Sequence, residues 1–237
     1  MRHLPSRRSL STALIISLAV GSTANAHDDD YRKLLSQQPP VFGPIWTAND
    51  DTQARGLFDM QNMTLLANIP LNNFPGVNVT SGNDCWGYVS PSGREYAIMG
   101  VEGGFGFVEI TDPINPVVID TVTGPVSIWH DVKVVGQYAY GVSEGGSGIQ
   151  VMDLSDIDNG NVTLVRNWTG GGYNTTHNII TNEETGSLWL AGANIGNGGL
   201  INIDLSNPAL PSIDGGWTDM YVHDAQVVTW HEGPLAG

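Results

Sequence analysis

The sequence of 237 residues contains one cysteine, Cys85, and only nine Lys and Arg against 24 Asp and Glu. A single cysteine cannot form a disulfide within the chain, so the fold is predicted to depend on packing. The formal net charge of −15 would repel a phosphate backbone, and we expect no nucleic-acid partner. The acidic residues are spread along the chain, unlike those of an acidic disordered tail.

Long apolar runs are also scarce, and the clearest one lies at the amino terminus. Residues 1–26 have the pattern of a secretory signal peptide, with three Arg, an apolar run from Thr12 to Val20 and a small-residue cleavage site, Ala24-Asn25-Ala26. The apolar run is too short to span a bilayer. The sequence therefore predicts a secreted protein, extracellular or at the cell surface, with an uncleaved anchor helix as the alternative.

Helical periodicity is missing as well. No stretch keeps the apolar period of a helix over three turns. After residue 60, short β-rich runs alternate with Gly, Asn, Asp and Pro turns about every 8–12 residues, which is typical of all-β proteins. The 30 Gly and 13 Pro agree with many tight turns. Residues 27–60 show little periodicity and are expected to form a mostly irregular N-terminal segment.

A short motif recurs through the β-rich region. His130-Asp131 returns as His177-Asn178 and as His223-Asp224, so the His positions lie 47 and then 46 residues apart. In the clearest unit four predicted strands fall within about 40–50 residues, the size of one β-propeller blade. Each of three units also has a β-run that ends in Asp, at Asp112, Asp153 and Asp204.

The fold prediction is therefore an all-β β-propeller built of four-stranded blades. The blades are placed at about 84–123, 129–169 and 176–218, with the start of another at 222, all within a domain of residues 61–237. Met63–Asn68 echoes a fourth strand without its first three. We thus expect an incomplete ring that lacks roughly two to three blades; a complete, open four-blade structure is the alternative.

Several motifs in this region resemble the LVIVD-repeat secreted proteins known as the choice-of-anchor B family. The similarity covers about residues 60–237, and its clearest segments are Asn83–Tyr88, Gly93–Ala97, Ile149–Leu154, His177–Ile180, Asn182–Gly186, Gly198–Leu200 and His223–Gln226. The resemblance implies a secreted β-propeller followed by a variable anchoring segment beyond Gly237, the only expected link to a membrane. It implies no defined activity. Members of the family often have Arg where His130 stands.

In a propeller, the first strand of each blade and the loop between its second and third strands meet at one face. Two kinds of side chain are therefore expected at the channel mouth. The candidate metal ligands are His130, His177 and His223, and the candidate ligand-binding residues are Glu102, Asp131, Glu144, Asn178, Asn194 and Asp224. Such groups could bind Zn²⁺ or another divalent ion. The alternative is turn and cap chemistry, in which these side chains bond backbone groups between blades.

A second candidate ion site is the loop Asp156–Asn161, which has part of a Ca²⁺-loop pattern but lacks its third acidic position and distal Glu. A plain turn is predicted there. No Gly-x-Ser-x-Gly elbow, zincin spacing or phosphate loop occurs. The predicted function is therefore a non-catalytic, secreted or cell-surface propeller that binds a protein, glycan or ion. The alternative is a metal-dependent extracytoplasmic hydrolase with a His/Asp/Glu site at the channel mouth.

Overall fold

The computed structural model describes residues 41–48, 61–77, 79–234 and 236. The predicted signal peptide and most of the segment 27–60 lie outside these described residues. The described residues belong to one compact unit, Gln38–Gly237. No helix among them has the length and apolar character that crossing a membrane requires.

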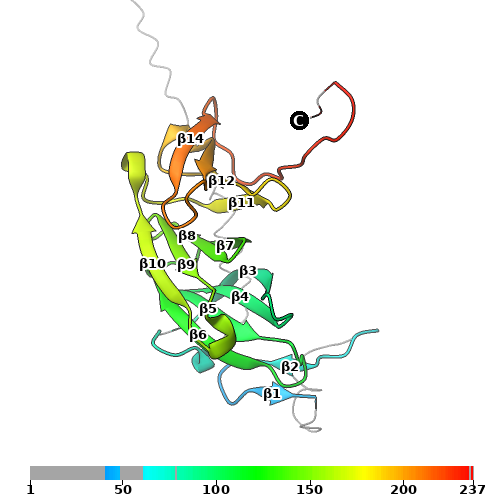
Figure 1. Ribbon diagram of the computed structural model, residues 1–237. Helices are drawn as coiled ribbons and strands as arrows, with labels where there is room; N and C mark the ends of the chain where they lie inside the picture. Colours follow the sequence, from blue (N-terminus) through cyan, green and yellow to red (C-terminus); the bar gives the residue numbers. More distant parts are fainter. Residues whose placement is uncertain (1–40, 49–60, 78, 235, 237) are drawn as a thin grey trace, which may run out of the picture. The chain divides into compact units, whose positions relative to one another are not determined.

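The prediction of an all-β fold is confirmed. Three four-stranded antiparallel sheets follow one another along the chain, each with its strands in sequence order (Figure 1). Consecutive antiparallel hairpins produce this order directly. The strands of the three sheets are β3 (Gly82–Val89), β4 (Glu95–Val101), β5 (Gly104–Glu109) and β6 (Val117–Thr123); β7 (His130–Val135), β8 (Tyr138–Ser143), β9 (Ile149–Asp153) and β10 (Thr163–Trp168); β11 (Asn178–Asn182), β12 (Ser187–Ala191), β13 (Leu200–Asp204) and β14 (Ser212–Trp217).

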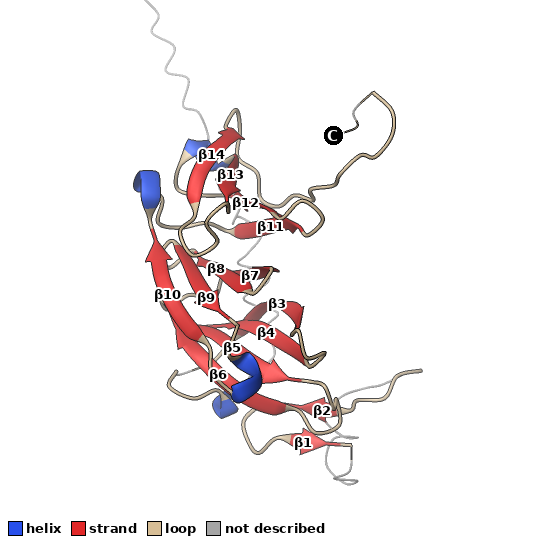
Figure 2. Cartoon of the chain, viewed as in Figure 1, coloured by secondary structure: helices blue, strands red, loops and turns tan. Residues whose placement is uncertain are grey.

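Shorter elements connect and precede these sheets. A two-stranded antiparallel pair, β1 (Trp46–Thr47) and β2 (Ala67–Asn68), comes first among the described elements. The helical turns of the described residues are all short 3-10 segments, drawn in blue in Figure 2, at η2 (Leu71–Asn73), η3 (Ile157–Asn159), η4 (Gly170–Gly172) and η5 (Gly196–Gly198).

The first strands of successive sheets lie side by side. Strand β3 contacts β7, and β7 contacts β11, while β6, β10 and β14 lie at the opposite edge of the sheets (Figure 1). The segment 222–231 continues this series beside β11. The Asn178 amide donates to the His223 carbonyl at 3.0 Å, and the Asn182 amide donates to the Thr229 hydroxyl at 2.8 Å. The described sheets do not close into a ring.

The Asp residues that end three β-runs have a common local role. Each accepts a hydrogen bond from the backbone N–H two residues further on, which is the bond of an Asx turn. The donors to Asp112, Asp153 and Asp204 are Ile114, Ser155 and Ser206, at 3.1, 2.8 and 2.7 Å. The repeated Asp thus turns the chain out of the third strand toward the fourth.

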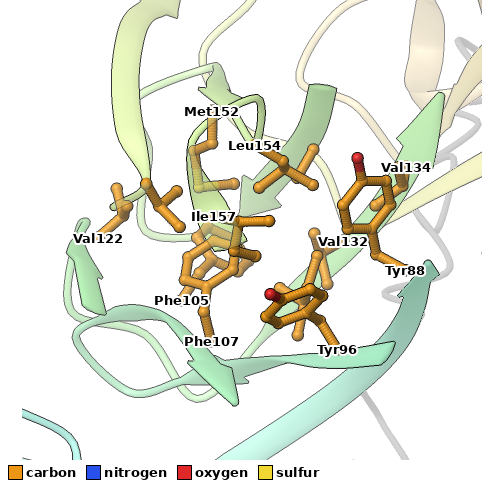
Figure 3. Packing of buried hydrophobic residues seen from close by; sticks show 13 residues of the cluster. Tyr88, Tyr96, Phe105, Phe107, Val122, Val132, Val134, Met152, Leu154 and Ile157 are labelled. Atoms are coloured by element: carbon orange, nitrogen blue, oxygen red, sulfur yellow. The ribbon is translucent and has the colours of Figure 1, made fainter. Parts of the chain in front are cut away.

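Two buried apolar clusters lie between neighbouring sheets. Between the first and second sheets, apolar side chains from both form one buried cluster (Figure 3), including Tyr96, Phe105, Phe107, Met152 and Leu154. These five side chains are at most 1% exposed. A second cluster joins the second and third sheets. Because strand side chains alternate between faces, each inner sheet can contribute to a cluster on either side.

Candidate functional site

The structure brings two of the three candidate metal ligands together. The rings of His177 and His223 have centroids 4.1 Å apart, and the ring of Trp129 lies 5.8 Å from that of His177. Trp129 and His177 come just before β7 and β11, and His223 lies in the segment 222–231 beside β11. The sequence repeat therefore places them at the same end of neighbouring strands, as expected for equivalent positions.

His130 lies in a different environment. It is 1% exposed, and its ring packs edge-on against Phe105, with centroids 5.3 Å apart. Neither ring nitrogen makes a hydrogen bond of normal geometry with the described residues. Burial lowers the pKa of this imidazole, although the nearby Pro125 and Ser127 carbonyls act in the opposite direction. A neutral imidazole packed in the core is the natural result.

Glu144 joins the His177–His223 pair from the loop between β8 and β9. Its carboxylate Oε1 lies 2.5 Å from Nδ1 of His177. The His177 side chain is 6% exposed and that of Glu144 is 26% exposed. This contact links the second sheet to the third and fixes the orientation of the His177 ring. We refer to Trp129, Glu144, His177 and His223 as the histidine cluster.

Glu102 and Asn194 occupy the corresponding loops of the first and third sheets, but their side chains bond backbone groups. A Glu102 carboxylate oxygen accepts from the N–H of Thr80 at 3.0 Å. The Asn194 side-chain oxygen accepts from the N–H groups of Asn174 and Thr175, at 2.8 and 3.0 Å. These bonds hold the segment that leads into each first strand, as the cap interpretation expects.

The residues that follow the histidines also bond backbone groups. Asp131 and Asp224 each accept from the next N–H in the chain, at 2.7 and 2.8 Å, and Asp84 does the same one repeat earlier. Asp131 additionally accepts from the N–H of Ile179 in the third sheet, at 2.8 Å. At the same position of the third sheet, the side-chain amide of Asn178 donates to the His223 carbonyl. These side chains connect one first strand to the next.

Asp131 lies beside two charged side chains, Lys133 and Asp84, that were not among the predicted site residues. Lys133 Nζ contacts one oxygen of Asp131 and lies 3.4 Å from Asp84. Burial raises the pKa of Asp131 to about 7, and a hydrogen bond with Asp84 acts in the same direction. Burial opposes the shift at Asp84, yet its bond to Asp131 and the Lys133 charge hold the pKa of Asp84 below its usual range. The Asp-x-Lys spacing puts both charged side chains on one face of the strand, and this pattern in the sequence could have predicted their contact.

The raised pKa of Asp131 predicts a pH-dependent stability. The pKa of an aspartate in an unfolded chain is about 3.9, so the folded state holds the extra proton between about pH 4 and pH 7. The contribution of Asp131 is therefore fully present below about pH 4 and is lost as the pH rises through about 7. The pKa of Asp84 is lowered, so its contribution to stability is present above about pH 4 and is lost as the pH falls below that value.

Denaturant unfolding of the wild type and of Asp131→Asn tests this prediction. At about pH 4.5 the wild type should have the higher free energy of unfolding. We expect its difference from the variant to decrease as the pH rises to about 8. A difference that stays constant over this range would contradict a titration of Asp131 there.

The described residues contain no group of three or more His, Cys, Asp or Glu side chains placed to hold a metal ion. The acidic groups of the loop Asp156–Asn161 are engaged in other bonds. Asp156 accepts from the side-chain amides of Asn159 and Asn161, at 2.6 and 2.7 Å. Asp158 accepts from the hydroxyl of Tyr96 at 2.7 Å. This loop is a turn that also ties the second sheet to the first.

No protein-family model, curated protein or solved structure matches this chain. The resemblance to the choice-of-anchor B family therefore stays a prediction from sequence motifs. Within the structure, the nine predicted site residues divide into three groups. His177, His223 and Glu144 come together; His130 packs in the core; Glu102, Asp131, Asn178, Asn194 and Asp224 bond backbone groups.

Proposed function

We propose that the three sheets are blades of a β-propeller. Two observations support this arrangement. The first strands of successive sheets contact one another, and the bonds between them recur with the sequence repeat, joining residues 48, 45 and 47 positions apart. Radial repetition of four-stranded sheets with adjacent inner strands is the architecture of a propeller.

The chain acts, in this proposal, as a non-catalytic binding module that is secreted or held at the cell surface. The observation that carries the proposal is the difference in contacts between two groups of predicted site residues. Asp131, Asn178, Glu102 and Asn194 connect strands and loops, which is a structural role. The histidine cluster differs because aromatic, imidazole and carboxylate groups of its residues contact one another at one end of the first strands. Such groups suit recognition of a protein or glycan surface.

The histidine cluster supports a hydrolase less well. A catalytic metal site needs about three protein ligands with an open position. Here the Glu144 carboxylate already lies against Nδ1 of His177, so a metal ion at that nitrogen would have to displace this contact. The signal-peptide pattern in residues 1–26 supports the secreted location in this proposal.

A ligand screen tests the binding role. We expect purified protein to give a saturable signal on a glycan array or on a panel of extracellular protein domains. Because the cluster would supply the contacts, His177→Ala combined with His223→Ala should weaken that signal at least tenfold, as measured by biolayer interferometry with the ligand found.

His231→Ala is the matched control, because His231 is 69% exposed and pairs with Glu184 away from the cluster. It should leave binding unchanged. Stoichiometric Zn²⁺ in the purified protein, with ester or peptide hydrolysis that the double substitution abolishes, would overturn the proposal in favour of the hydrolase.

A further inference from the structure

A cleft of about 520 Å³ lies where the first strands end, whereas the histidine cluster lies where they begin. Its walls come from all three sheets. Residues Trp86–Val89 end β3, Val134 and Val135 end β7, and Glu183 lies in the turn between β11 and β12. The volume falls within the range of about 300–1,000 Å³ typical of ligand pockets.

Much of the wall of the cleft is apolar. Val89 is 61% exposed at its edge, and Trp86, Ile110 and Val135 are partly exposed beside it. A valine this exposed is unremarkable alone, but a concave group of such side chains is typical of binding sites. Tyr88 and Tyr96, whose ring centroids lie 6.2 Å apart, also line the cleft.

Two carboxylates, Glu95 and Glu183, stand at the rim of this cleft, and both are exposed. Neither forms an ion pair with any described residue. The nearby cations are already neutralised, since Arg94 pairs with Glu109, and Lys133 pairs with Asp131 and Asp84. Within the described part of the chain the basic residues are Arg94, Lys133 and Arg166, so the field around the cleft is negative.

We infer that this cleft binds a basic segment of a partner protein, with Lys or Arg side chains meeting Glu95 and Glu183 and an apolar side chain between them on Trp86 and Val89. The two carboxylates come from different sheets, which suits two cationic groups spaced along an extended peptide. Trp86 already carries the Lys133 ammonium 4.7 Å from its ring centre, so the indole takes part in cation–π contact. This site is separate from the histidine cluster and does not depend on a ligand there.

A defined probe tests the inference. The probe is an acetylated and amidated Leu-Lys-Val-Lys-Leu-Gly peptide, titrated into ¹⁵N-labelled full-length protein by NMR at low salt. We expect shifts at Trp86, Val89 and Glu183. Glu95→Gln combined with Glu183→Gln should raise the Kd at least tenfold, because both rim charges are removed. Val89→Ser should raise it several-fold, because the apolar wall is reduced.

Two controls separate a site from general attraction to an acidic surface. Asp219→Asn with Asp224→Asn removes the same charge from two exposed residues that do not line the cleft and should leave the Kd unchanged. A probe with Ser in place of its Leu and Val residues should bind at least fivefold more weakly. Equal weakening by both double substitutions, equal binding of the Ser probe, binding of spermidine at the same Kd, or shifts outside the cleft would each overturn the inference.

Discussion

Replacing Asp131 by alanine is expected to lower the free energy of unfolding by about 3–5 kcal/mol, because it removes an acceptor of both the Lys133 ammonium and the buried N–H of Ile179. The Asp131 side chain is 3% exposed. Its loss would leave the Lys133 ammonium, whose side chain is 12% exposed, with the Asp84 oxygen at 3.4 Å as its remaining carboxylate partner. It would also leave the buried N–H of Ile179 without its acceptor, which adds a desolvation cost. Denaturant unfolding at about pH 6, followed by tryptophan fluorescence, measures the change.

Asp224→Ala is the matched control, because Asp224 occupies the same position of the repeat. It makes the same bond to the next N–H, from Ala225 at 2.8 Å, but it is exposed. We expect its loss to cost about 1 kcal/mol or less. Similar costs for the two substitutions would show that the bond between first strands at Ile179 contributes little to stability.

Local patterns explain why the fold class could be predicted. The run His130 to Val135, the turn at Gly136 and the run from Tyr138 to Ser143 form β7 and β8 with those bounds. Turn residues and β-rich runs act over a few residues, so the sequence displays them directly. The same holds for Asp153, whose hydrogen bond to the N–H of Ser155 depends only on its neighbours.

The candidate site could be predicted only in part, because equivalent positions of the repeat have different surroundings. Glu102 and Glu144 lie in corresponding loops. Glu102 accepts from the N–H of Thr80, just before the first strand of its own sheet, whereas Glu144 contacts His177, just before the first strand of the next sheet. His130 and His177 occupy the same position of the repeat. The ring of His130 packs against Phe105, whereas the ring of His177 contacts the Glu144 carboxylate. Which neighbour faces a side chain depends on contacts across sheets, and the repeat alone does not carry that information.

The second large effect is expected at Gly104, the first residue of β5. Its φ is +145°, a backbone conformation that is essentially confined to glycine. A Cβ atom there would lie 2.1 Å from the Val122 carbonyl oxygen and 2.8 Å from the Gly124 nitrogen. Both are backbone atoms, and Gly104 pairs with Val101 and Thr123 across the sheet, so relief requires strand β6 to move. Gly104→Ala is therefore expected to lower the free energy of unfolding by about 3 kcal/mol or more, combining strain and steric overlap.

Two other glycines separate the causes of this effect. Gly136 has a φ of +61° with no atom within 4 Å of an added Cβ, so Gly136→Ala should cost only the backbone strain, about 1–2 kcal/mol. Gly215 in β14 has neither constraint, and Gly215→Ala should be neutral or slightly stabilising, by about 0.5 kcal/mol. The graded order Gly104, Gly136, Gly215 in denaturant midpoints is the expected result. A Gly104→Ala protein as stable as the Gly136→Ala protein would mean that β5 and β6 do not pair as closely as the structure shows.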